Sequence, residues 1–378
     1  MLISGQQMKK HDMKMGGSLL VGALFAITYG QSAFGQTITP PPQPTTGPGS
    51  AQYLYGVVQS GPFTVSGQSK KSGYTYYTFT PVGLHPTQSN PHPLPTPASA
   101  PVVLFLSAED SEAVAYSDYL FLIQQLAAFG YSTIFANYTQ KEEQKDYSAV
   151  VEADLKDALN QLTTNATLVK PTLGANGQPL YTVVGHSEGA YLALNLAATA
   201  VQNGVPVPAA VVSFEANPGK LAAFNAQAID PSTLVILLVG DDDDSGRICP
   251  SVTVWSQLTQ IPSVYKPFLY ARSDSTGTPA QLANHWFPLT YTDKDTDPTY
   301  YAVDNRDWNI TYKLSVAATA CVSDGLYCDY ALGNGPLNQY GVTTQTDLGF
   351  WSNGQQVLPL VLEINPVLAF STDKCSTN

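Results

Sequence analysis

The run from Tyr181 to Gly189, with the sequence YTVVGHSEG, is the feature that most constrains how this chain can fold. A short apolar segment breaks there into a Gly-x-Ser-x-Gly pattern, and an alanine- and leucine-rich segment continues to about Asn203. This pattern predicts a buried strand, a sharp turn and a helix. The turn strains the backbone of its serine and needs small flanking residues, here Gly185 and Gly189. Ser187, at the centre of the turn, is therefore a candidate nucleophile, and the N-terminus of the predicted helix can favour an oxyanion beside it.

A serine nucleophile needs a proton acceptor, and histidine suits this role near neutral pH. Three of the five histidines lie in an N-terminal leader or in a proline-rich stretch: His11, His85 and His92. His186 adjoins Ser187, but adjacent side chains at such a turn point in different directions. We expect His186 to pack or to position the turn. His285 remains as the predicted base.

The third member should be a carboxylate that orients the base. Residues 233–240 are continuously apolar, which is typical of a strand buried on both faces of a parallel sheet. Four aspartates follow, at the strand end where catalytic loops gather in open α/β sheets. Asp243 and Asp244 are the predicted acid candidates. Glu215, after the strand-like run 209–214, is a further candidate.

The aspartate run also admits a calcium-binding interpretation. Positions one, three, five and six of an EF-hand loop are matched by Asp241, Asp243, Ser245 and Gly246. Position twelve, however, is Val252, where a bidentate glutamate is required. We therefore predict neither a metal nor an organic cofactor.

The chain order of serine, acid and histidine is that of the α/β-hydrolases. On these residues the chain resembles the α/β-hydrolase superfamily. Within it, the chain is most similar to the secreted esterases and lipases, which include dienelactone-hydrolase-like proteins and bacterial cutinases or polyester hydrolases. The resemblance covers most of the chain after the leader, with similar segments at 61–65, 74–79, 101–107, 119–136 and 283–288. It implies an α/β-hydrolase fold with a mostly parallel, doubly wound central sheet, N-terminal antiparallel strands and a C-terminal extension.

The resemblance also implies an oxyanion hole. One backbone N–H should come from Glu188, directly after the nucleophile, and the other from Asp110. The loop 107–110 departs from the family pattern, because it carries two acidic residues and lacks the usual glycine. Trp286, beside the predicted base, is expected to contact substrate.

Breaks in composition predict the domain organisation. Lysines, an apolar stretch and small residues read as a signal peptide over residues 1–35, with cleavage near Gly35. Residues 36–50 are rich in proline and glycine and predict a disordered or extended arm. Residues 51–378 then form a single catalytic domain.

The four cysteines all lie in the last third of the chain and form an even set. In an oxidising compartment they predict two disulfides. Cys321 with Cys328 is the easiest closure, and Cys249 would then pair with Cys375. Three pairings nevertheless remain open from the sequence, as do free buried cysteines.

The formal net charge of −12 argues against nucleic acid and anionic membranes as partners. The apolar part of the leader is too short for stable membrane insertion. These features predict a secreted monomer that cleaves carboxylic esters through an acyl-enzyme, on a small-molecule, lipid or polymer ester. Two alternatives stay open. A serine peptidase or amidase would use the same three residues, and a non-catalytic binding protein would account for the altered loop.

Overall fold

The computed structural model describes residues 37–68, 73–87, 92–109, 114–138, 147–243, 248–290 and 302–371, together with Cys375. The predicted leader, residues 1–35, lies outside these ranges. Thr37–Asn378 form one compact unit.

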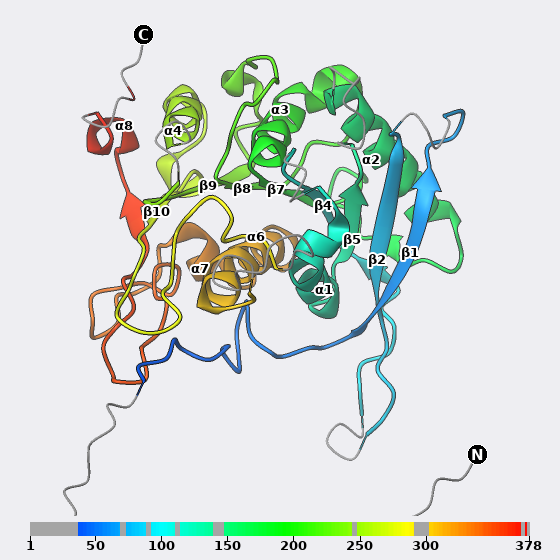
Figure 1. Ribbon diagram of the computed structural model, residues 1–378. Coiled ribbons are helices and arrows are strands. Elements are labelled where there is room, and N and C mark those ends of the chain that lie inside the picture. The colour runs from blue at the N-terminus through cyan, green and yellow to red at the C-terminus, as the bar shows by residue number, and fades with distance from the viewer. Residues whose placement is uncertain are drawn as a thin grey trace, which may run out of the picture. The chain divides into compact units, whose positions relative to one another are not determined.

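A nine-stranded sheet with the order β1-β2-β5-β4-β7-β8-β9-β10-β11 forms the centre of this unit (Figure 1). The strands from β5 to β10 in this order are parallel, whereas β1, β2 and β11 pair antiparallel with their neighbours. The fold is therefore a mixed α/β fold with a mostly parallel sheet and an antiparallel N-terminal pair. The strands are β1 (Gly56–Thr64), β2 (Thr75–Val82), β4 (Val102–Leu106), β5 (Ser132–Ala136), β7 (Tyr181–His186), β8 (Ala210–Phe214), β9 (Leu234–Gly240), β10 (Phe268–Ala271) and β11 (Val361–Glu363). Two short strands, β3 (Ser99–Ala100) and β6 (Lys170–Pro171), pair separately.

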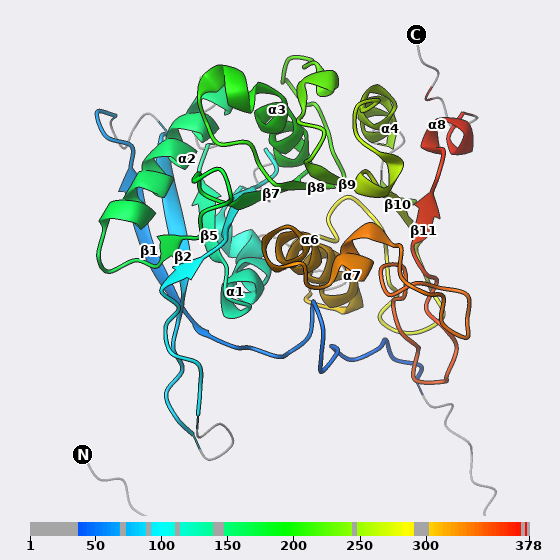
Figure 2. The ribbon, with the colours of Figure 1, turned by 180° about the vertical axis from the view of Figure 1, so that it is seen from behind.

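Helices cover both faces of the sheet. Figures 1 and 2 show α2, α3 and α4 on one face and α1, α6 and α7 on the other. The helices are α1 (Leu120–Ala128), α2 (Tyr147–Thr164), α3 (Glu188–Asn203), α4 (Ile248–Gln257), α6 (Lys313–Asp324), α7 (Cys328–Leu332) and α8 (Pro366–Ala369). A π-helical segment, Asp307–Tyr312, leads into α6.

Each central strand supplies two cores, because alternate side chains point to opposite faces. In β4, Val102, Leu104 and Leu106 belong to the core under α2 and α3. Val103 and Phe105 of the same strand belong to the core with α1 and α6. All of them are fully buried, which explains why these strands read as unbroken apolar runs.

The proline-rich arm, expected to be disordered or extended, lies against later parts of the chain. Residues 37–50 form no helix or strand, yet Pro41, Pro48 and Gly49 are buried. Gly49 has φ +84°, and a Cβ added there would lie 1.9 Å from the Trp308 carbonyl oxygen. Thr39 donates a backbone hydrogen bond of 2.9 Å to the Ser352 hydroxyl. Proline-rich composition predicted an extended chain but could not reveal that later residues provide a surface for it. Residue 36 lies outside the described ranges.

The C-terminal extension completes the fold. It supplies α6, which packs against β7 and β8, and the edge strand β11. Two disulfides join Cys249 to Cys375 and Cys321 to Cys328, the pairing that the sequence favoured. They are compatible with an oxidising compartment. In the described part of the chain, every helix is too short or too polar to cross a bilayer.

Candidate active site

Ser187 lies at the turn between β7 and α3, as the glycine pattern predicted. Its φ of 57° is in the left-handed region, a strained conformation for a residue with a side chain. A Cβ added to Gly185 would lie 2.3 Å from the Gly189 carbonyl oxygen. One added to Gly189 would lie 2.2 Å from the Ser107 carbonyl oxygen. Only glycine allows strand, turn and helix to approach this closely, and the strain presents the serine hydroxyl above the sheet.

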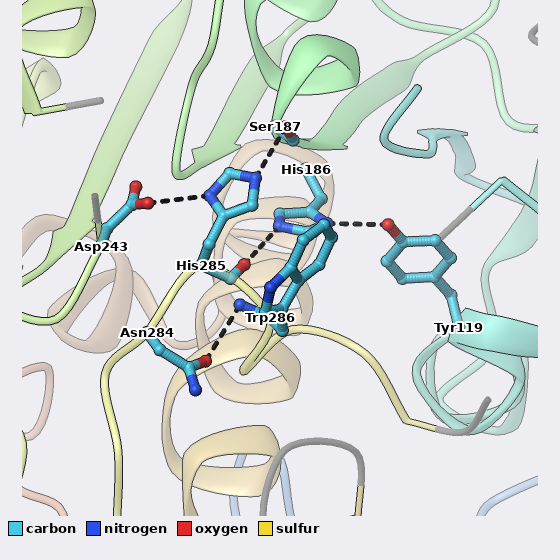
Figure 3. A network of polar contacts seen from close by, with 7 residues as sticks. All are labelled: Tyr119, His186, Ser187, Asp243, Asn284, His285 and Trp286. Carbon is cyan, nitrogen blue, oxygen red and sulfur yellow. Dashed lines mark hydrogen bonds and ion pairs between the residues drawn. The ribbon is translucent and has the colours of Figure 1, made fainter. Parts of the chain in front are cut away.

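Three loops at the carboxyl ends of the strands bring a serine, a histidine and an aspartate together (Figure 3). The Nε2 of His285, on the loop after β10, lies 2.8 Å from the Ser187 Oγ. The Nδ1 of the same ring lies 3.1 Å from Oδ1 of Asp243, which follows β9. All three residues are buried. Of the two acid candidates, Asp243 is the one beside His285, and Asp244 lies outside the described residues.

Glu215, the further acid candidate, also lies near this group. It is fully buried at the end of β8 and has φ 53°. Its carboxylate, that of Asp243 and an imidazole nitrogen of His285 lie within 4.8 Å of one another. Among the described residues this is the group with spacing that could hold a metal ion. However, Ser187 and Asp243 already engage both ring nitrogens of His285, so we assign no metal to it.

The structure describes part of the predicted oxyanion hole. Glu188 is the first residue of α3, where backbone N–H groups have no acceptor within the helix. The neighbouring loop is fixed by two tyrosines. Tyr138 donates to the Ser107 carbonyl at 2.5 Å, and the Ala108 N–H donates to the Tyr119 hydroxyl at 3.2 Å. The Ala108 N–H is thus already used, and Asp110 lies outside the described residues.

A pair of carboxyl groups, those of Glu109 and Glu188, lies in the same pocket as Ser187. Burial raises the pKa of Glu188 to about 8, and its hydrogen bond with Glu109 contributes to the same shift. The hydrogen bond from Glu188, followed by those from Lys220 and Tyr147, holds the pKa of Glu109 below its usual range. At neutral pH the Glu188 carboxyl therefore keeps its proton and donates a hydrogen bond to the Glu109 carboxylate. A neutral Glu188 adds no negative charge next to its own backbone N–H.

A pocket of about 200 Å³ opens at the serine. Its walls include Glu109, Glu188, Asn217 and Lys220 as well as Ser187, His285 and Trp286. Trp286 is half-buried, with its ring 4.9 Å from that of His285 between centroids. The pocket is therefore mainly polar, with an indole on the side of the base.

Sequence reasoning did not identify the contacts of His186 and Tyr119. His186 is fully buried, and its Nδ1 lies 2.7 Å from the Tyr119 hydroxyl. Its Nε2 lies 2.7 Å from the backbone carbonyl oxygen of His285 (Figure 3). The position of His186 next to Ser187 indicated that it lies near the site, but nothing in the sequence pointed to Tyr119 or to Lys220.

In this arrangement His285 can take the proton of the Ser187 hydroxyl, and Asp243 can stabilise the resulting imidazolium. No protein-family model matches this chain, and a search of curated proteins found no match.

Proposed function

We propose that this protein is a serine carboxylic-ester hydrolase with an α/β-hydrolase fold. The observation that carries the proposal is the geometry at Ser187: a strained serine with His285 Nε2 at 2.8 Å and Asp243 behind the imidazole. The order of the parts along the sheet supports the fold assignment. The nucleophile follows a central strand and precedes a helix, and the acid and base follow later strands of the same sheet.

The reaction would proceed in two halves. The Ser187 Oγ attacks the ester carbonyl carbon as His285 Nε2 takes its proton, which gives a tetrahedral oxyanion. The Glu188 N–H and a second donor from the 107–110 loop stabilise that charge. The C–O bond to the alcohol then breaks, and His285 returns the proton to the leaving oxygen. Water, deprotonated by His285, attacks the acyl-enzyme, and the acid and free Ser187 are released.

The two disulfides and the leader-like N-terminal sequence support a secreted enzyme. The polar walls of the pocket favour an ester with a short acyl group over a long-chain lipid. The acyl preference is open to direct measurement with a series of p-nitrophenyl esters, and the alcohol preference with a series of acetate esters of different alcohols.

Intact mass after incubation with a fluorophosphonate tests the nucleophile and base. We expect one adduct on the wild type, none on Ser187→Ala and a strongly slowed reaction for His285→Ala. The matched control is Ser213→Ala, since Ser213 is a fully buried serine on the adjacent strand β8. It should label like the wild type.

A second measurement separates the proposal from its alternatives. Hydrolysis of matched acetyl esters and anilides should favour the ester, and faster cleavage of the anilide would instead indicate a peptidase or amidase. Folded wild-type protein that is inert to both substrates and to the fluorophosphonate would refute the hydrolase proposal and favour a binding protein.

A further inference from the structure

A continuous chain of polar contacts connects the two loops that flank the nucleophile. It starts at the Ala108 N–H in the 107–110 loop and passes through the Tyr119 hydroxyl, at 3.2 Å. It continues through the His186 imidazole, at 2.7 Å, and ends at the backbone carbonyl of His285, also at 2.7 Å. One end is thus on the 107–110 loop, which we call the oxyanion loop, and the other is the main chain of the predicted base.

The chemistry of the two ends determines the direction of each hydrogen bond. A carbonyl oxygen can only accept a hydrogen bond, so the Nε2 of His186 must carry a proton and donate the hydrogen bond to the His285 carbonyl. In a neutral imidazole the Nδ1 then accepts, and the Tyr119 hydroxyl donates to it. The same hydroxyl accepts from the Ala108 N–H. Every donor in the chain has one acceptor, which is what a buried polar network needs to be stable.

The link through His186 is short and rigid. His186 is the last residue of the central strand β7 and precedes the strained Ser187. Its ring lies 4.9 Å from the His285 ring and 6.3 Å from the Trp286 ring, between centroids. Tyr119 packs on Phe105 of β4 with ring centroids 4.7 Å apart. Tyr119 and His186 are both fully buried, so the chain of contacts restrains the position of the His285 main chain.

We propose that His186 is a positioning residue for the base: its Nε2–H fixes the His285 backbone so that the imidazole reaches the Ser187 hydroxyl, and Tyr119 couples this position to the oxyanion loop. The inference rests on the proposed hydrolase activity and goes beyond it, because neither residue touches the reacting atoms. An apolar residue of similar size would fill the same space but would leave the His285 carbonyl without a donor.

Two substitutions separate the two hydrogen bonds that the His186 imidazole makes. His186→Gln places an amide near the position of Nε2 and keeps a donor for the His285 carbonyl. His186→Asn places its amide near Nδ1, facing Tyr119, and loses that donor. Since a misplacement of about 1 Å can cost about 10²-fold in rate, we expect kcat of His186→Asn to fall by about 10²-fold with KM within about threefold. His186→Gln should recover most of the loss.

The control is Tyr181→Phe, at the opposite end of the same strand. Tyr181 is buried, and its hydroxyl donates to the Pro206 carbonyl at 2.7 Å. This variant loses a comparable hydrogen bond without touching either loop, so it should lower the melting temperature but leave kcat and KM unchanged. Tyr119→Phe is the second probe of the chain. It should lower kcat too, and it keeps the test available if His186→Asn fails to fold.

Steady-state kinetics on a p-nitrophenyl ester, with the melting temperature of each variant, decide the matter. A selective kcat loss in His186→Asn and Tyr119→Phe, with recovery in His186→Gln, supports the proposal. Equal kcat in all folded variants and the control would overturn it and leave the hydrolase activity intact. A wild type that is inert while Ser187→Ala behaves identically would overturn the hydrolase proposal, and the positioning role with it.

Discussion

Glu188 provides a test of how charge beside the proposed oxyanion hole controls the rate. Its pKa of about 8 means that the carboxyl is about nine-tenths protonated at pH 7 and about nine-tenths ionised at pH 9. Because its backbone N–H is a proposed oxyanion donor, the ionised side chain opposes the developing negative charge. If only the protonated form is active, kcat at pH 9 is about a tenth of its maximum. Activity is present below the pKa and lost as pH rises through it.

The substitution Glu188→Gln keeps a neutral hydrogen-bonding side chain at every pH. We expect its kcat to stay level between pH 7 and pH 9, where the wild type declines. Glu109→Gln is the matched variant, because it removes the neighbouring carboxylate that helps to raise the pKa of Glu188. Its decline should begin at lower pH than in the wild type. The assay is p-nitrophenyl acetate hydrolysis over this range, corrected for spontaneous hydrolysis. The reasoning is refuted if wild type, Glu188→Gln and Glu109→Gln share one alkaline limb.

Three other predictions follow from distances and loop lengths. Asp243→Asn should lower kcat by about 10⁴-fold in a protein of unchanged melting temperature, and a loss under tenfold would exclude Asp243 as the acid. Gly189→Ala should destabilise the fold by about 3 kcal/mol or more in urea denaturation, because the new Cβ would lie 2.2 Å from the Ser107 oxygen. Loss of the Cys249–Cys375 disulfide, which spans 126 residues, should cost about 5 kcal/mol. Loss of Cys321–Cys328, which spans 7 residues, should cost about 2.4 kcal/mol. Equal costs in denaturant titrations of the two double serine variants would contradict the chain-entropy argument.

Sequence patterns located the central elements because those elements obey local rules. The apolar run 233–240 and the alanine- and leucine-rich segment after Ser187 correspond to β9 and α3 within a residue or two. Burial on both sheet faces makes such strands visible as unbroken apolar runs. The packing of residues 37–50 followed no local rule. It depends on partners such as Ser352 and Trp308, which lie hundreds of residues away.

The candidate site shows the same division. Ser187 could be named from the Gly-x-Ser-x-Gly turn and His285 by elimination among the five histidines, whereas the acid stayed open between Asp243, Asp244 and Glu215. The structure brings Ser187, His285 and Asp243 within contact distance. Tyr119 had no comparable signal. Its role depends on where α1 packs relative to His186, and a one-dimensional pattern does not contain that distance.

The docking of residues 37–50 constrains the order in which parts of the chain can fold. Thr39 bonds with Ser352, 313 positions later, and the Thr278 N–H donates to the Ile38 carbonyl at 2.8 Å. At about 5–20 residues per second, a ribosome takes roughly 16–60 s to make the intervening chain. The first segment of the compact unit to leave the ribosome is therefore among the last to find its place. A proline-rich sequence suits that delay, because it resists forming a helix or pairing with the wrong strand while it waits.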